Sequence, residues 1–320
     1  MLDRPATFAR TLALALACAC APAAAQDSRP LTIVLPFPAG GGSDAIARAL
    51  GERIAPKLGR AVVVDARPGG SGLVASRYVL GQPADGNVMF LASPTVMIIL
   101  PRITKLEFDP VQAFMPVANV GANPFILGVH QSVPARDLRE FVDLVRRAPG
   151  RYNYASGGSG TSTHLVAALV LKRAEVDLVH IPYKGGAPAI LDLVAGHVHA
   201  YFGNPVDFRG HAGGAVRLIA SSGERRSPDL PEVPTIAETY PGFRLVTWNG
   251  LVARAGAPAP AVERVARAVV DALKDPDLAQ ALRRIGVDPL PQSPVEFAET
   301  IRRDRLLWDD AIRTANIRID

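Results

Sequence analysis

The chain has 320 residues, of which 48% are hydrophobic and 20% charged, and its formal net charge is +5. This length is enough for about two domains, since domains commonly span ~100–200 residues. Because the basic residues are interspersed with acids, as in "RRDRLLWDDAIRTANIRID", the sequence lacks the basic stripe of a nucleic-acid-binding protein, although its mild positive charge favours anionic solutes.

The first 25 residues have the layout of a secretory signal peptide. Arg4 and Arg10 precede an apolar run at residues 12–21, and three alanines then form a small-residue cleavage site. The apolar run is too short for a membrane span, which needs ~20 residues. We therefore expect cleavage near Ala25-Gln26 rather than an uncleaved anchor.

Both cysteines of the chain, Cys18 and Cys20, lie inside this segment. A lipid-modified N-terminus is an alternative, but the residues before each cysteine fit a lipoprotein signal poorly. After cleavage the chain has no cysteine, so it can form no disulfide and carries no thiol nucleophile or thiolate metal site. Its stability must then come from packing.

The remaining chain repeats strand–loop–helix units, which predicts an α/β fold with mainly parallel sheets. In the first half, we expect strands at "LTIVLPF", "AVVVDARPGG", "VMFLASPT" and "FILGVH", with helices from Asp44, from Ser71 and at "DLREFVDLVRRAPG". In the second half, strands are expected at "RYNYAS", "VDLVHIPY", "HVHAYFGN" and "AVRLIASSG", with helices at "HLVAALVLKRA" and "APAILDLVAG" and three more after residue 260. The predicted division is a signal peptide at 1–25, a first lobe at 26–123, a second at 124–246, and a return to the first at 247–320.

A glycine-rich loop, "PFPAGGGSD", lies between the first strand and the first helix. A helix start has about four N–H groups without intrahelical partners and carries partial positive charge. Gly40, Gly41 and Gly42 have no Cβ to keep a ligand away from these groups, so the loop is a candidate anion site, with Ser43 or Asp44 as the helix cap. An ordinary glycine-rich turn explains this loop equally well by itself.

A second loop, "ASGGSGTSTH", repeats the pattern in the other predicted domain and adds several hydroxyl groups. Two helix N-termini that face each other across a cleft would suit a carboxylate. A charge-assisted hydrogen bond contributes ~1.5–3 kcal/mol, and micromolar affinity requires ~8 kcal/mol. Several such bonds from both loops would therefore have to cooperate.

Signatures of enzymes and metal sites are weak. The glycine loops match neither a nucleotide P-loop nor a dinucleotide fingerprint, and no nucleophile elbow occurs. His164 is expected in the first turn of its helix, without an activated serine. His197 and His199 would share one face of a strand and could bind metal, but with no third ligand evident we expect surface or packing histidines. Lys184 lies before another helix start, where it could pair with an anion or be simply solvated.

Six motifs in series resemble one known family. They are "LPFPAGGGSDAIARAL", "ARPGGSGLVASRYV", "YNYASGGSGTSTHLVAAL", "IPYKGGAPAILDLVAGHVHAYFGN", "RRSPDLPEVPTIAE" and "WNGLVARAGAPAP". Together they resemble the periplasmic substrate-binding proteins of tripartite tricarboxylate transport systems, also called Bug receptors. The resemblance implies a type II periplasmic-binding-protein fold, in which two α/β lobes joined by a hinge close on a small solute.

The resemblance also implies a function. The expected protein is a monomeric, non-enzymatic receptor in the periplasm that needs no cofactor or metal and binds a small carboxylate. Its expected partner is a permease made of two integral-membrane subunits. Two alternatives remain: a receptor that presents its solute to a sensor kinase, and an enzyme on the same scaffold.

In similar proteins a ligand carboxylate lies between the two glycine-rich loops, and the ends of two further strands complete the pocket. The residues implied by this resemblance and by the loops are Phe37, Pro38, Gly40, Gly41, Ser43, Asp44, Ser93, Thr95, Ser156, Gly158, Ser159, Gly160, Thr161, Ser162, His164, Tyr183, Lys184 and Asn204. One departure is Gly203, because many relatives carry an acid or another side chain there. Its absence suggests that no acid near Asn204 pairs with a ligand ammonium group, so an organic acid without an amine is expected.

Overall fold

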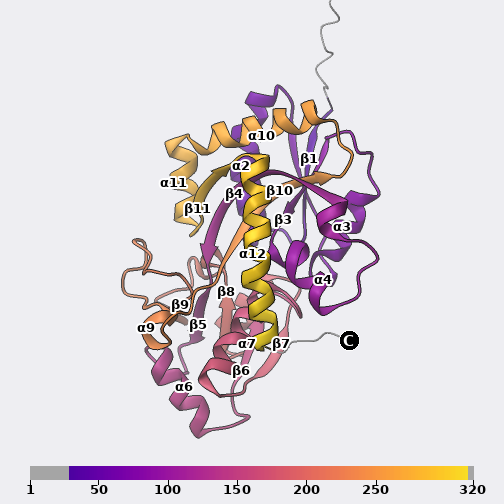
Figure 1. Cartoon of the computed structure of the whole chain (residues 1–320). Coiled ribbons are helices and arrows are strands. Elements are labelled where there is room, and N and C mark those ends of the chain that lie inside the picture. Colours follow the sequence, from indigo (N-terminus) through magenta and orange to yellow (C-terminus); the bar gives the residue numbers. More distant parts are fainter. Residues whose placement is uncertain (1–28, 316–320) are drawn as a thin grey trace, which may run out of the picture.

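The computed structural model describes residues 29–315, and their strands form two separate sheets, one above the other in Figure 1. The sheets define two lobes. The upper sheet contains, in spatial order, β11 (Asp288–Gln292), β4 (Phe114–Pro124), β10 (Val246–Arg254), β3 (Val88–Ala92), β1 (Leu31–Leu35) and β2 (Val62–Ala66). The lower sheet contains β7 (Val179–Pro182), β6 (Asn153–Ser156), β8 (Ala200–Gly203), β5 (Ile126–His130) and β9 (Val216–Ser221).

Helices cover these sheets. Those of the first half are α2 (Gly42–Leu58), α3 (Leu73–Leu80), α4 (Leu100–Ile103), α5 (Pro110–Ala113) and α6 (Leu138–Arg147), with the short turns η1 (Gly70–Gly72) and η2 (Thr95–Ile99). Those of the second half are α7 (Ser162–Ala174), α8 (Gly186–Val194), α9 (Ile236–Thr239), α10 (Ala259–Leu273), α11 (Pro276–Arg284) and α12 (Pro294–Ala315), with the short turn η3 (Pro205–Phe208).

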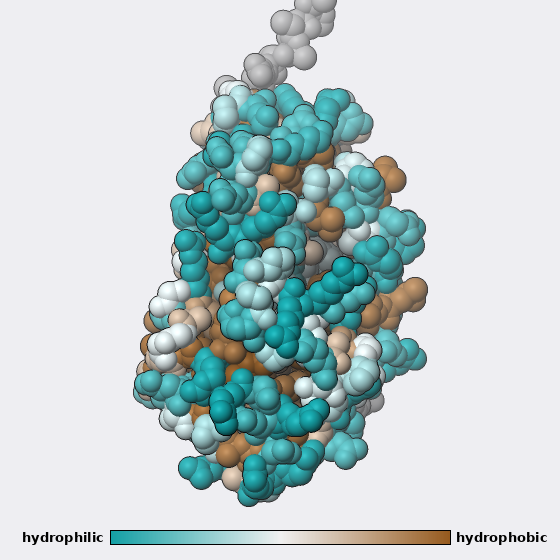
Figure 2. Space-filling model, turned by 90° about the vertical axis from the view of Figure 1, so that its left-hand side faces the viewer, coloured by the Kyte–Doolittle hydropathy of each residue, from teal (hydrophilic) through white to brown (hydrophobic). Residues whose placement is uncertain are grey.

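Strand β1 shows why the apolar run at its position becomes a central strand. Leu31, Ile33 and Leu35 pack into one hydrophobic cluster, whereas Val34 packs into another on the opposite face. Successive side chains of a strand point to opposite faces, so a strand covered on both sides must be apolar throughout. Figure 2, which shows the left-hand side of Figure 1, is hydrophilic over most of its surface, as expected when apolar side chains are turned inward.

Both sheets are mixed, so the prediction of mainly parallel sheets was wrong. Strand β1 is parallel to β2 and β3, but β10 is antiparallel to β3 and β4. Likewise β6 is parallel to β7 and β8, but β5 is antiparallel to β8 and β9. The reason is that β4 leads out of the upper lobe and β10 leads back into it, so the two strands run in opposite directions.

Strands β4, β10 and β11 were not predicted. In β4, Pro116, Asn119, Gly121 and Asn123 interrupt the apolar run, and residues of this kind are depleted in strands. Strand β11 reads "DPLPQ" and lies at the edge of its sheet, where proline is tolerated. Ser71 does not open a helix either. It lies in the short turn η1 with a left-handed φ of 53°, and α3 begins two residues later.

The chain crosses between the lobes after β4 and again before β10 (Figure 1). Lobe boundaries at 123/124 and 246/247 stay a prediction. Helix α12, assigned from the sequence to the first lobe, packs on both β4 and α7. Its buried Trp308 meets Phe125, at the first crossing, edge-to-face with ring centroids 6.5 Å apart. Helix α12 therefore packs against both lobes.

The predicted signal peptide at residues 1–25, with Cys18 and Cys20, lies outside the described residues. Within residues 29–315, none of the helices combines the length and apolarity needed to cross a bilayer.

Candidate functional site

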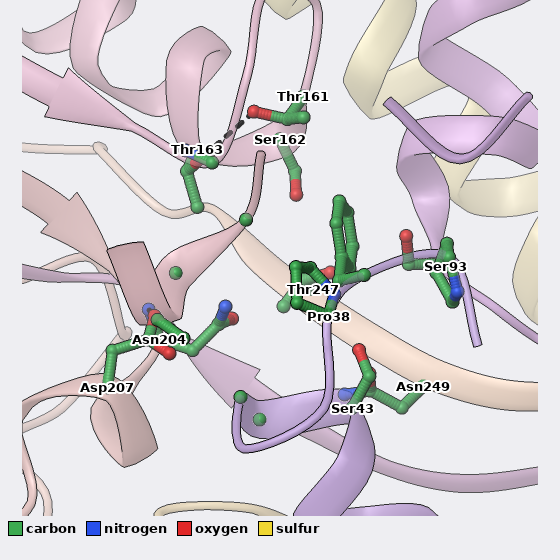
Figure 3. A pocket seen from close by; sticks show the side chains of 18 of the residues that line it. Pro38, Ser43, Ser93, Thr161, Ser162, Thr163, Asn204, Asp207, Thr247 and Asn249 are labelled. Atoms are coloured by element: carbon green, nitrogen blue, oxygen red, sulfur yellow. Dashed lines mark hydrogen bonds between the residues drawn. The ribbon is translucent and has the colours of Figure 1, made fainter. Parts of the chain in front are cut away.

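A small cavity with a volume of about 50 Å³ lies between the two lobes. Ser43 from the upper lobe and Ser162 from the lower lobe lie on opposite sides of it (Figure 3). Its lining consists of Pro36, Phe37, Pro38, Gly41, Gly42, Ser43, Leu91, Ser93, Gly157, Thr161, Ser162, Thr163, Gly185, Gly186, Ala187, Tyr201, Asn204, Asp207, Thr247 and Asn249.

The N-terminus of α2 forms the upper wall. Its cap is Gly41, with no side-chain hydrogen bond, so the expected cap at Ser43 or Asp44 was wrong. Asp44 instead turns back to accept from the Gly40 amide at 3.1 Å and pairs with Arg48 at 2.9 Å. Burial raises the pKa of Asp44, but the bonds from Arg48 and Gly40 outweigh it and hold the pKa below its ordinary value. Among the described residues, the amides of Gly42 and Ser43 have no partner.

The N-terminus of α7 forms part of the lower wall. Thr161 caps it by accepting from the His164 amide at 3.3 Å. Most amides of the preceding loop are bonded internally: Gly157 donates to Thr163 Oγ1 at 2.9 Å, and Gly160 donates to His164 Nδ1 at 3.1 Å. These bonds hold the loop in one shape. Thr163 lines the cavity, and its backbone amide has no hydrogen-bond partner within the described chain.

A third helix N-terminus, that of α8, also lines the cavity, through Gly185, Gly186 and Ala187. The amides of Gly186 and Ala187 likewise have no partner in the described part of the chain. Sequence reasoning noted a helix start here but selected Tyr183 and Lys184, which precede it. The signal that could have found the amides is the glycine pair directly before the helix, the same feature that identified the first loop.

The remaining wall contains Asn204, which follows β8, and Thr247 and Asn249 of β10, a strand at the crossing between the lobes. Asn249 Nδ2 donates to Asn123 Oδ1 at 3.2 Å, and Asn123 Nδ2 donates to Asn204 Oδ1 at 2.9 Å. Asn249 and Thr247 belong to β10 and were missed from the sequence, because only the antiparallel return of β10 brings them to the cavity. This amide chain fixes Asn204 relative to both crossing strands.

An acid, Asp207, also lines the cavity. Its carboxylate accepts from the Tyr201 hydroxyl at 2.7 Å and from the Asn204 amide at 2.9 Å. Burial raises its pKa. No acid was expected near Asn204, because Gly203 takes the place of one, and this was wrong: Asp207 follows Asn204 by three residues. A ligand without an amine stays a prediction.

The predicted site residues fall into three groups. Those lining the cavity are Phe37, Pro38, Gly41, Ser43, Ser93, Thr161, Ser162 and Asn204. Those lining a neighbouring hollow, which shares Pro36, Phe37 and Gly157 with the cavity, are Gly158, Ser159, Tyr183 and Lys184. Those lining neither hollow are Gly40, Asp44, Thr95, Ser156, Gly160 and His164. Contact of any of them with a ligand stays a prediction.

The lobes touch around the cavity. The Ser71 hydroxyl donates to the Ser159 carbonyl at 2.7 Å, and the Ser162 amide donates to Thr95 Oγ1 at 3.1 Å. Gly42 packs so closely on Val206 that an added Cβ would lie 2.6 Å from Val206 Cγ1. These contacts join the upper lobe to the lower one, so the structure shows a closed cleft.

His164 lies in the first turn of α7, as expected, but it faces another histidine. Its ring stacks on that of His180, with centroids 4.0 Å apart and an interplanar angle of 4°. Burial lowers the pKa of His164 to about 4; burial and the charge of His164 lower that of His180 to about 3. Both rings are therefore neutral at pH 7 and support the loop rather than supply charge.

The other histidine pair does not share a strand face, so that expectation was wrong. His197 and His199 both precede β8, and their Nδ1 atoms lie beside different partners, Asp192 at 3.3 Å and Asn153 at 2.7 Å. No cluster of three histidine, cysteine or acidic side chains within residues 29–315 is arranged to hold a metal ion.

Comparison with known proteins places this geometry in a family. Residues 46–317 match the tripartite tricarboxylate transporter family receptor. A UPF0065 protein from the tcbD–tcbE intergenic region of Pseudomonas sp. (strain P51) is 35% identical over 288 residues, 89% of this chain and 86% of that protein.

Solved structures of similar proteins support the same family assignment. An R. palustris protein determined with adipate is 30% identical, with a TM-score of 0.88 over 91% of this chain and 99% of its own. The periplasmic binding protein BugD is 27% identical, with a TM-score of 0.86 over 91% of this chain and 98% of its own. The expected two-lobed α/β fold of periplasmic binding proteins is confirmed, as is a receptor rather than an enzyme. The chain belongs to the tripartite tricarboxylate transporter receptor family, whose members are periplasmic solute-binding proteins.

Proposed function

We propose that this receptor captures a small carboxylate between its lobes and presents it to a tripartite tricarboxylate-type transporter with two membrane subunits. The observation that carries the proposal is the convergence of three helix N-termini, those of α2, α7 and α8, on one cavity between the lobes. Each N-terminus carries partial positive charge and leaves backbone amides without intrahelical partners.

The cavity can hold an anion without a cationic side chain. Of the described residues that line it, none is lysine, arginine or histidine. The donors are instead the amides of Gly42, Ser43, Thr163, Gly186 and Ala187, supplemented by neighbouring hydroxyls. At ~1.5–3 kcal/mol for each hydrogen bond to a charged group, about four of them match the ~8 kcal/mol of a micromolar complex.

The same arrangement provides a mechanism of capture. A carboxylate that accepts from α2 on one side and from α7 and α8 on the other interacts fully only when the cleft is closed. A ligand shifts a conformational equilibrium only by its differential affinity for the two states. Hinged closure around the solute is thus driven by hydrogen bonds that the open conformation cannot make. The membrane partner then binds the closed conformation.

The comparisons support both parts of the proposal. Adipate, present in the R. palustris structure, is a dicarboxylate, and the family's name supports delivery to a transporter.

A thermal-shift screen of residues 26–320 tests the ligand class. Carboxylates of three to six carbons should raise Tm, whereas the matching uncharged diamides should not. Binding to the folded state adds ~2.7 kcal/mol at a hundredfold excess over Kd. Gly41→Val, which fills the cavity at the cap of α2, should abolish the shift, and Gly214→Val, in a remote loop, should retain it. Diamides as effective as acids, or no response to any acid, would contradict the proposal.

Uptake by cells tests delivery. Deletion of the gene should abolish uptake of the acid identified in the screen, and the wild-type gene should restore it. Unchanged uptake together with the loss of an acid-induced transcriptional response would replace transport with signalling to a sensor kinase.

A further inference from the structure

Asp207 is the only acid among the described residues that line the cavity, and its position is unusual for an anion site. The residue is 8% exposed, and one carboxylate oxygen accepts from both the Tyr201 hydroxyl and the Asn204 amide. The carboxylate also lies against the first turn of α8: a Cβ added at Gly186 would be 2.4 Å from Oδ1. Figure 3 shows Asp207 beside Asn204 at the cavity wall.

No cationic side chain within residues 29–315 pairs with this carboxylate. The elements around it carry Tyr201 on β8, Asp44 and Arg48 on α2, the exposed Lys184 before α8, the half-buried Asp192 on α8, and Arg209 at the end of η3. Of these groups, only Tyr201 is hydrogen-bonded to Asp207, and no ion pair involves Asp207 within the described chain. Burial without a counter-charge disfavours the ionised carboxyl, and the pKa of Asp207 is raised accordingly.

We propose that Asp207 is the residue that links ligand capture to protonation: it takes up one proton when a carboxylate enters the cavity, so that acid is bound more tightly at lower pH. The inference rests on the proposed function, because it requires an anionic ligand. A second negative charge in the same closed space favours the neutral form of Asp207, since a like charge raises the pKa of a carboxyl. Once protonated, its hydroxyl can also donate a hydrogen bond.

A rival role for Asp207 is pairing with a ligand ammonium group. The location argues against this role, because Asp207 is almost completely buried and one of its oxygens already accepts two hydrogen bonds. Both bonds that Asp207 receives are also needed to hold Tyr201 and the Asn204 turn in place. We therefore favour a proton over an ammonium group as the charge that neutralises Asp207.

Isothermal titration tests the inference with adipate, or with the acid that gives the largest thermal shift if adipate gives none. Titrations from pH 6.5 to 9, where such acids are ionised, are run in two buffers with different ionisation heats. The difference in heat gives the number of protons taken up per ligand. Wild type should take up close to one proton at pH values that lie between the pKa of Asp207 in the free protein and its higher pKa in the complex. Kd should rise up to tenfold per pH unit in that interval.

Asp207→Asn keeps the oxygen acceptor but cannot ionise, so it should bind with no proton uptake and with a Kd that is independent of pH. Asp271→Asn, which removes an exposed carboxylate on α10 that does not line the cavity, should retain the wild-type slope. If Asp207→Asn does not fold, proton uptake by wild type remains decisive.

Ligand binding by wild type without proton uptake between pH 6.5 and 9 would overturn this inference and leave the proposed function standing. A preference of wild type for glutamate or aspartate over dicarboxylates, lost in Asp207→Asn, would overturn it in favour of the ammonium role. Failure of every acid to bind wild type would overturn both proposals.

Discussion

Closure of the cleft depends on a glycine, and Gly42→Ala should weaken ligand binding without destabilising the fold. Gly42 is the first residue of α2 in the upper lobe, and Val206 belongs to η3 in the lower lobe. The added methyl would lie 2.6 Å from Val206 Cγ1, closer than nonbonded carbons approach. The clash exists only when the lobes meet, so an open cleft accommodates alanine freely.

The magnitude follows from packing. Extra methyl groups in a well-packed contact typically cost ~1–3 kcal/mol, which here penalises the closed state alone. At 1.4 kcal/mol per tenfold change, Kd should rise by about 5- to 140-fold. The open protein should not lose stability, because alanine within a helix is favoured over glycine by ~0.5–1 kcal/mol.

Isothermal titration with the acid found in the screen measures Kd, and thermal unfolding without ligand measures stability. The matched control is the double variant Gly42→Ala/Val206→Ala, in which the offending Cγ1 is gone. It should recover most of the lost affinity. Equal affinities of wild type and Gly42→Ala, or a double variant as weak as the single one, would refute closure through this contact.

Three further outcomes are expected. Thr95→Val removes the oxygen that accepts from the Ser162 amide across the cleft. An unsatisfied buried donor costs ~1–3 kcal/mol, so the Kd for the ligand should rise by about 5- to 140-fold. Thr95→Ser, which keeps the hydroxyl, should bind with the wild-type Kd in the same titration. In the folded protein the pKa is lowered to about 4 for His164 and to about 3 for His180, whereas both rings protonate near pH 6.5 in the unfolded chain. Their contribution to the free energy of unfolding is therefore complete above pH 6.5 and is lost as the pH falls below that value. Thermal unfolding should therefore show a smaller drop in Tm from pH 6.5 to 5 for His180→Gln than for wild type, and equal drops would contradict the neutral pair. Trp308→Ala empties the contact of α12 with Phe125 and should cost ~3–5 kcal/mol in urea unfolding; a loss below 1 kcal/mol would show that α12 does not brace the lobes.

Local sequence determined the two glycine-rich turns. Each lies between an apolar run, which forms a buried strand, and a periodic segment, which forms a helix, and these patterns depend only on neighbouring residues. Gly41, Ser43, Thr161 and Ser162 from these turns lie on the cavity lining, and their contact with a ligand stays a prediction. The family resemblance added Ser93 and Asn204 at the ends of two further strands.

The tertiary structure alone decided which other groups meet at the cavity. Thr247 and Asn249 reach it because β10 returns antiparallel to β4, and strand direction is not encoded in a short apolar run. The pairing of His164 with His180, and the placement of Asp207 against α8, join segments separated along the chain and brought together by the sheet order. Hydrophobic pattern and turn chemistry act over a few residues, whereas the charge balance of the cavity is set by which turns from both lobes pack around it.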